Sequence, residues 1–201
     1  APPGLDDSRI YTTSVDSTWR PGLSWLGGTS LLQHALAGLA LTVYNLGVCS
    51  ENSLNIKARL RRVLPMRLLP RHEAKLVLSF GVNDAKMENC RRKLSLTQSL
   101  EACRAILAQA TSLVPVLFIG PLPVLDYAHL ARVEELSDAF AQISQEMCVP
   151  YLEMCRALTR DPVYFDSLNA VGDGYHPGAT GYEAIAQRVL SWDAWQALFR
   201  Q

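Results

Sequence analysis

Five residues spread along the chain have the side chains and the spacing that an acyl-transfer site needs. Ser17 supplies a hydroxyl, and Asp173 and His176 stand three residues apart in a glycine-rich stretch. A serine hydroxyl becomes a nucleophile near neutral pH only when a base lies beside it. His176 is the candidate base, since it directly precedes a predicted helix, and Asp173 could hold its imidazole ring in the required tautomer. These three residues predict a catalytic triad.

The other two residues, Gly47 and Asn83, are candidate hydrogen-bond donors. Acyl transfer passes through a tetrahedral intermediate whose negative oxygen needs donors aimed at it. The Asn83 side-chain amide and the Gly47 backbone N–H suit that role, with the Ser17 backbone N–H as a third donor. A glycine at position 47 lets the backbone approach a ligand closely. Together the five residues predict a covalent acyl-Ser17 intermediate that water resolves.

The apolar run at residues 76–80 is the element that must position Asn83. Such a run is typical of a strand buried on both faces of a parallel sheet. Gly81 breaks the run, and Asn83 and Asp84 follow at once. They therefore lie at the carboxyl end of a buried strand, where open α/β sheets bind ligands. The simpler alternative is a turn that only ends the strand.

Strand and helix patterns alternate along the whole chain. The expected strands cover residues 9–15, 40–45, 76–80, 114–119 and 149–152. The expected helices cover 29–39, 52–64 (ending before Pro65), 96–110, 130–147 and 182–190, with a turn-rich loop at 172–181. This alternation predicts an α/β fold with right-handed crossovers, a three-layer flavodoxin-like sandwich whose five-stranded parallel sheet has the order 2-1-3-4-5 and helices on both faces. In that order Ser17, Gly47 and Asn83 follow neighbouring strands and face one crevice.

Length and composition limit the class of protein. The 201 residues suit a single domain, with residues 1–8 as a loose N-terminal arm. The 19 basic and 19 acidic residues balance, which argues against a nucleic-acid partner. No apolar run reaches the roughly 18 residues of a membrane span. Nothing in the composition indicates an oligomeric state.

The five cysteines are scattered and form no CxxC pair, so free thiols in a reducing compartment are expected, and neither a disulfide framework nor a metal site is. A cytoplasmic location follows, although the first residue is Ala and a targeting segment could have been removed. The sequence indicates no cofactor.

Four short blocks of the sequence resemble those of a known family. The blocks are Val-Asp-Ser at 15–17, Asn-Leu-Gly-Val at 45–48, Gly-Val-Asn-Asp at 81–84 and Asp-Gly-Tyr-His-Pro at 173–177. Their order resembles that of the SGNH hydrolases, the GDSL esterase/lipase family, over roughly residues 10–190. The last two blocks match in full, whereas Val15 replaces the glycine of the first. The resemblance implies a serine hydrolase of small acyl esters, and the family also includes thioesterases, lysophospholipases, carbohydrate deacetylases and acyltransferases. The predicted units leave no long insertion for a lid, so we expect an open cleft and short acyl groups.

The sequence leaves three alternatives open. A flavodoxin-like domain could bind a flavin or phosphate beside the hydroxyl-rich residues 12–14, which would leave Asp173 and His176 without a role. Cys49, close to Gly47, could replace Ser17 as the nucleophile. A relative of the family that has lost activity is the third, because Val15 at positive φ would displace Ser17. We expect Val15 to be extended and Ser17 to be correctly placed.

Overall fold

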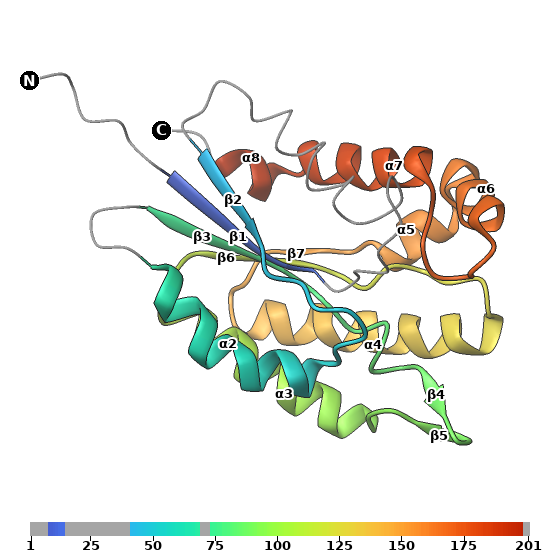
Figure 1. Ribbon diagram of the computed structural model, residues 1–201, viewed down its shortest axis with the longest axis horizontal. Coiled ribbons are helices and arrows are strands. Elements are labelled where there is room, and N and C mark those ends of the chain that lie inside the picture. The colour runs from blue at the N-terminus through green and yellow to red at the C-terminus, as the bar shows by residue number, and fades with distance from the viewer. Residues whose placement is uncertain (1–7, 15–40, 69–72, 199–201) are drawn as a thin grey trace, which may run out of the picture.

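The computed structural model describes residues 8–14, 41–68 and 73–198, which alternate between strands and helices (Figure 1). The strands are β1 (Ser8–Ser14), β2 (Leu41–Asn45), β3 (Ala74–Ser79), β4 (Met87–Glu88), β5 (Arg91–Arg92), β6 (Val116–Ile119) and β7 (Tyr151–Leu152). The helices are α2 (Ser53–Arg67), α3 (Leu96–Thr111), α4 (Tyr127–Glu146), α5 (Cys155–Thr159), α6 (Pro162–Val171), α7 (Ala179–Leu190) and α8 (Asp193–Ala197). The predicted α/β class is confirmed.

Five of the strands pair side by side in the order β2-β1-β3-β6-β7, and each pair is parallel. β1 lies between β2 and β3, and its last residue, Ser14, is in register with Ser79 at the end of β3. The carboxyl ends of β1 and β3 therefore meet at the same edge of the sheet. β4 and β5 form a separate antiparallel hairpin.

Both faces of the sheet are covered by helices, α2, α3 and α4 on one side and α5 to α8 on the other (Figure 1). Successive β3 side chains point to opposite faces, because the side-chain period of a strand is two. Leu76 and Leu78 accordingly pack in the core with α2, α3 and α4, whereas Val77 packs with α5 to α8. The strand is buried on both faces, as its apolar run predicted.

An aromatic group fills the core beneath the end of β3. The rings of Phe80 and Phe118 stack with their centroids 4.7 Å apart, and Phe140 of α4 meets Phe80 edge-on at 5.3 Å. Burying such a side chain contributes about 1.5–3 kcal/mol. This packing provides a rigid base for the turn that follows β3.

Polar caps explain where the main helices begin. At the start of α2, the Asn52 side chain accepts the Asn55 backbone N–H, and the Asn55 side chain accepts the Asn52 backbone N–H. Ser95 and Gln98 form the same reciprocal pair at the start of α3. The predicted end of α2 before Pro65 is wrong, because the helix continues to Arg67. Pro65 lies in the last turn, where its fixed φ is helical and its missing N–H costs a single hydrogen bond.

Several short elements were not predicted. The β4–β5 hairpin turns at Asn89 and Cys90, both with positive φ (50° and 59°), and α5, α6 and α8 fall in stretches without a long apolar period. α4 and α7 also begin three residues earlier than predicted, at Tyr127 and Ala179. The predicted helix at 29–39, residues 1–7 of the predicted arm and Val15 lie outside the described residues.

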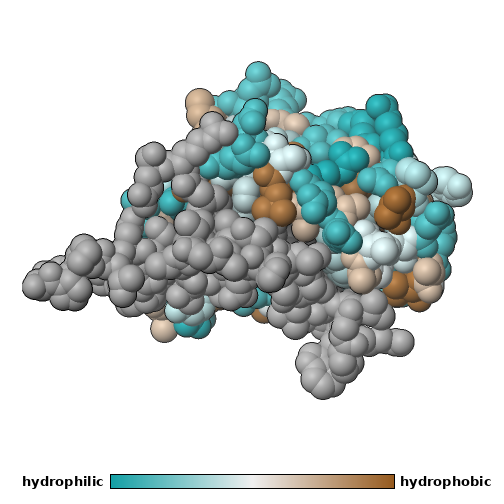
Figure 2. Space-filling model, turned by 90° about the horizontal axis from the view of Figure 1, so that it is seen from above, coloured by the Kyte–Doolittle hydropathy of each residue, from teal (hydrophilic) through white to brown (hydrophobic). Residues whose placement is uncertain are grey.

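The face seen in Figure 2 is mostly hydrophilic in its coloured part, with hydrophobic groups scattered among polar ones. Among the described residues, no helix is long and apolar enough to cross a membrane.

Candidate active site

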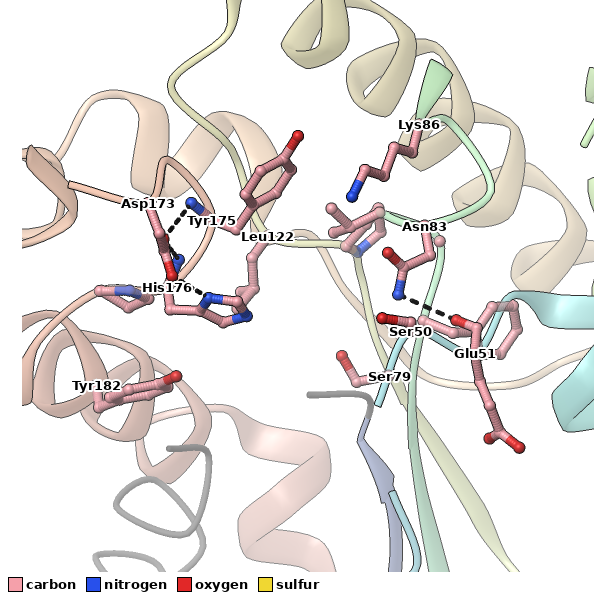
Figure 3. A pocket seen from close by; sticks show the side chains of 15 residues that line it. Ser50, Glu51, Ser79, Asn83, Lys86, Leu122, Asp173, Tyr175, His176 and Tyr182 are labelled. Atoms are coloured by element: carbon pink, nitrogen blue, oxygen red, sulfur yellow. Dashed lines mark hydrogen bonds and ion pairs between the residues drawn. The ribbon is translucent and has the colours of Figure 1, made fainter. Parts of the chain in front are cut away.

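A cavity of about 290 Å³ lies at the carboxyl edge of the sheet, between the end of β3 and the loop before α7 (Figure 3). Three of the predicted site residues, Asn83, Asp173 and His176, line it together. Asn83 and Asp173 are 90 positions apart in the sequence, so the fold and not the local sequence brings them together. His176 and Asn83 lie on opposite sides of the cavity, with Ser79 between them (Figure 3).

Asp173 and His176 form a tight pair. The His176 Nδ1 atom lies 2.5 Å from Asp173 Oδ2, and Asp173 Oδ1 accepts the backbone N–H groups of Tyr175 and His176, each at 2.8 Å. Because Nδ1 faces the carboxylate, Nε2 is the ring nitrogen that can exchange a proton with a substrate or nucleophile. The geometry is that of a base held by a carboxylate.

The Asp173 carboxylate is kept ionised by these contacts. Partial burial raises its pKa, but the hydrogen bonds from the His176 ring and from the two backbone N–H groups outweigh burial, and the net pKa is lowered from the ordinary value. A negative Asp173 near neutral pH can orient the imidazole and stabilise an imidazolium.

Two glycines shape the loop that carries this pair. Gly172, which ends α6, and Gly174 have φ values of 79° and 80°, a region that L side chains rarely adopt. The Gly174 carbonyl accepts the Leu125 N–H at 3.0 Å, which ties the loop to the segment after β6. The loop thus turns back over the end of the sheet and brings His176 to the cavity.

Asn83 presents its amide to the cavity from the turn after β3. Its Nδ2 atom donates to the Glu51 carbonyl oxygen at 3.1 Å, which fixes the orientation of the amide group. An amide nitrogen carries two hydrogens, so the second N–H is a further donor on the same side. In Figure 3 the Asn83 nitrogen points toward Glu51 at the border of the cavity.

The turn at residues 81–84 is fixed by its surroundings. Gly81 has a φ of 127°, a region that L side chains rarely adopt, and a Cβ atom there would also lie within a tight 3.0 Å of the Phe140 ring, so both observations favour glycine. Asp84 is fully buried, and its Oδ1 atom accepts the Ser53 N–H at the start of α2 at 2.8 Å. Burial raises the pKa of Asp84, an effect that the neighbouring Ser53 and Ser99 hydroxyls and the Arg92 guanidinium oppose only in part.

Two residues from α4 complete the support of this turn. His129 is buried, and its Nε2 atom lies 2.9 Å from the Val82 carbonyl oxygen, while Arg132 Nε donates to the Ala85 carbonyl oxygen at 2.8 Å. Since a carbonyl oxygen only accepts, Nε2 of His129 carries the proton. Burial lowers the pKa of His129, which favours the neutral ring. No role was predicted for His129 from the sequence, and the structure shows that it supports the turn after β3.

The remaining predicted residues are placed differently. The Gly47 N–H donates to the Asn45 side chain at 2.9 Å, and Gly47 does not line the cavity, although Ser50 and Glu51 just after it do. Ser17 lies outside the described residues. Cys49, considered as an alternative nucleophile, does not line the cavity either.

Sequence reasoning missed several residues that line the cavity, among them Ser50, Ser79, Lys86 and Tyr175. A signal existed for Ser79, because the last residue of a buried strand lies at the edge where ligands bind. Tyr175 lies inside the Asp-x-x-His-Pro block at a variable position. No sequence pattern indicated Lys86 or Ser50 as site residues. The positive φ of Ser50, 61°, is visible only in the structure. Among the described residues, no group of three or more His, Cys, Asp or Glu side chains is arranged to hold a metal ion.

The model of the GDSL-like Lipase/Acylhydrolase family matches residues 7–184. The chain therefore belongs to this family, as its four sequence blocks predicted. A search of curated proteins finds no match.

Solved structures share the fold over most of the chain. The lipase/acylhydrolase from Enterococcus faecalis has a TM-score of 0.72 at 19% identity, and the match covers 91% of this chain and 93% of that one. The psychrotrophic esterase EstA from a Pseudoalteromonas species has a TM-score of 0.73 at 15% identity, with coverages of 96% and 100%. The acetyl xylan esterase AlAXEase has a TM-score of 0.73 at 14% identity, with coverages of 91% and 98%. At such low identity the likeness shows a common fold.

Proposed function

We propose that this protein is a serine hydrolase that cleaves small acyl esters through an acyl-Ser17 intermediate. His176 is the general base and acid, Asp173 orients its ring, and Asn83 stabilises the oxyanion together with the backbone N–H groups of Gly47 and Ser17. The single observation that carries the proposal is the Asp173–His176 pair facing Asn83 across one cavity.

The course of β1 supports Ser17 as the nucleophile. In the flavodoxin-like five-stranded sheet that the sequence predicts, the chain leaves β1 beside the end of β3. Ser14 is in register with Ser79, which lines the cavity. Three residues of chain span at most about 11 Å between Cα atoms, so the cavity is within reach of Ser17 from the end of β1.

The proposed reaction has two steps. In the first, Nε2 of His176 takes the Ser17 hydroxyl proton while Oγ attacks the ester carbonyl, and the imidazolium then protonates the departing alcohol. In the second, water attacks the acyl-serine while His176 takes a proton from it, and the imidazolium then protonates the Ser17 Oγ atom as the carboxylic acid leaves. Asp173 stays ionised throughout, as its lowered pKa allows.

The oxyanion of both tetrahedral intermediates needs donors that are already in place. Asn83 suits this role because the Glu51 carbonyl holds its amide, so little reorganisation is needed when charge develops. The Gly47 N–H could act as a donor only if it left its hydrogen bond with the Asn45 side chain and bonded to the substrate oxygen. Asn83 is thus the donor with the stronger support.

Small esters fit the cavity best. A volume of about 290 Å³ is at the low end of ligand pockets. Family membership agrees with an ester substrate, as does the similarity in fold to esterases and acetyl xylan esterases.

Turnover of p-nitrophenyl acetate, butyrate and palmitate tests the proposal. We expect the two short esters to be cleaved faster than the palmitate. Ser17→Ala and His176→Ala should each remove nearly all turnover, and the double variant should be hardly slower than either single variant because members of a triad act as a unit.

Ser79→Ala is the matched control, since it removes another hydroxyl that lines the same cavity. Wild-type turnover in Ser17→Ala together with loss in Ser79→Ala would reject Ser17. A folded wild-type protein without any esterase activity would favour the inactive relative that Val15 suggests.

A further inference from the structure

The charges that line the cavity are not equally neutralised. Its two carboxylates are engaged, because Glu51 forms a two-point pair with Arg59 (2.7 Å for Nη2 to Oε2) and Asp173 pairs with His176. Lys86 also lines the cavity, and it forms no salt bridge with any residue in the described part of the chain. An ammonium group on the cavity wall therefore has no carboxylate partner among the described residues.

Contacts of both its backbone and its ammonium group hold Lys86 in place. Its backbone carbonyl accepts the Lys93 N–H at 2.8 Å, where the chain enters and leaves the β4–β5 hairpin. Its Nζ atom lies 5.2 Å from the centroid of the Tyr175 ring, within the range of a cation–π contact. Figure 3 shows the ammonium end turned toward the cavity, on the side of Tyr175 and Asn83. The group is half-buried and is not a freely moving surface lysine.

Two cations of the hairpin that follows Lys86 are paired with carboxylates. Lys93, seven residues along the same hairpin, pairs with Glu88 at 3.1 Å, and Arg92 pairs with Glu135 at 2.9 Å. A contact with an aromatic face compensates only part of the charge of an ammonium group. An incoming anion would interact more strongly, because charge-assisted hydrogen bonds are about twice as strong as neutral ones.

We propose that Lys86 makes the site selective for esters that carry a second, anionic group, a carboxylate or a phosphate, within reach of the scissile bond. The ammonium binds this anion, and the Tyr175 ring limits where the ammonium can lie. Lys86 is three residues from Asn83, so one substrate can reach both the oxyanion donor and the ammonium. The inference builds on the proposed ester hydrolysis and adds the charge of the substrate.

Matched pairs of esters test the selectivity and show which part of the substrate carries the charge. In the acyl arm, mono-p-nitrophenyl succinate is compared with p-nitrophenyl butyrate. In the alcohol arm, the acetyl ester of glycerol 3-phosphate is compared with that of glycerol. The measured quantity is the ratio of kcat/KM for the anionic ester to that for the neutral ester. We expect Lys86→Gln to lower this ratio about tenfold in one arm, equivalent to about 1.4 kcal/mol.

Two further variants separate charge from structure. Lys86→Arg keeps the positive charge and should retain most of the ratio, whereas Lys86→Glu should lower it further. Lys57→Gln, on the exposed face of α2, is the remote control and should leave the ratio unchanged. A ratio that Lys86→Gln leaves unchanged in both arms would overturn the proposal, as would an equal loss in Lys57→Gln.

A binding measurement keeps this test independent of catalysis. The anionic ester of each arm, monomethyl succinate for the acyl arm and the acetyl ester of glycerol 3-phosphate for the alcohol arm, is titrated by calorimetry into Ser17→Ala and into Ser17→Ala with Lys86→Gln. We expect the second protein to bind one of the two esters about tenfold more weakly at low ionic strength, and the difference to shrink as salt rises. Equal affinity for both esters would reject the anion site even if ester hydrolysis is established. Weaker binding without any wild-type hydrolysis would keep the anion site and reject the enzymatic proposal.

Discussion

The turn after β3 and the loop before α7 face each other across one cavity, but they are held in different ways. The turn at 81–84 is tied by contacts that are distant in the sequence and at least partly buried: Asn83 bonds to Glu51, Asp84 to Ser53, and the Val82 carbonyl to His129. The loop at 172–177 is tied mainly within itself, since Asp173 binds the backbone and ring of residues two and three positions later. One side of the site is a fixed part of the core, and the other is a local motif on its surface.

This difference separates two jobs. An oxyanion donor must not move when charge develops, which suits a turn fixed by the core. A base must exchange protons with several partners in turn, which suits a loop that is half-exposed and supported by one carboxylate. Substitutions in the loop should therefore change catalysis with little effect on stability, whereas substitutions in the turn should affect catalysis, stability or both, depending on the residue.

The largest expected effect is at Asp173. Asp173→Asn keeps the size of the side chain but no longer selects the tautomer with the proton on Nδ1, so kcat should fall about 10⁴-fold. Stability should change little, since the Asp173 side chain is 42% exposed. Steady-state kinetics and thermal melts of Asp173→Asn, with exposed Asp166→Asn of α6 as the control, measure both. Near wild-type kcat in Asp173→Asn would remove Asp173 from the site.

The lowered pKa of Asp173 also fixes the sign of a pH effect. A carboxyl whose pKa is lower in the folded protein contributes stability that is present above its unfolded pKa, about 3.9, and is lost as pH falls through the folded value. The melting temperature of Asp173→Asn should therefore approach that of the wild type as pH falls below about 4. A gap that widens with acid would contradict the assignment.

A smaller effect is expected at Asn83. Asn83→Ala removes a donor that is fixed in the ground state, so kcat should fall by roughly 10²–10³-fold with little change in KM. Asn169→Ala, an exposed amide on α6, is the control. An effect limited to KM or to the melting temperature would instead identify Asn83 as a binding or turn residue.

The smallest effect, and one on stability alone, is expected at Asp84. Asp84→Ala leaves the Ser53 N–H buried without an acceptor, which costs about 1–3 kcal/mol. Asp84→Asn keeps an acceptor and places its new N–H groups near the Ser53 and Ser99 hydroxyls, so its unfolding free energy at pH 7 should lie close to that of the wild type.

The raised pKa of Asp84 gives a pH test of this comparison. Wild-type stability is favoured while Asp84 is protonated, and it decreases as pH rises above the ordinary value of about 3.9 toward the raised folded value. In denaturant titrations, the unfolding free energy of Asp84→Asn should therefore rise relative to that of the wild type between about pH 4 and pH 7. A relative loss over that range would mean that the buried carboxylate is stabilised as an anion.

The same contrast explains what the sequence could predict. The Asp173–His176 pair lies within one short block, so residue types and spacing were enough to find it. Asn83 was found because a buried strand ends just before it. His129 and Arg132, which hold the turn from 47 positions away, carried no local signal, and neither did Lys86. The end of α2 was predicted too early, because in the sequence Pro65 in a last helical turn looks the same as a proline that ends a helix.

The most direct test of the central claim is covalent labelling by a fluorophosphonate, which reacts with an activated serine hydroxyl. The wild-type protein is treated with the reagent, digested, and the modified peptide is identified by mass spectrometry, with Ser17→Ala, His176→Ala and Ser79→Ala in parallel. We expect one adduct per chain on Ser17 in the wild type and in Ser79→Ala, and none in Ser17→Ala or His176→Ala. An adduct on Ser50, Ser79 or Cys49, or no adduct on the folded wild-type protein, would contradict it.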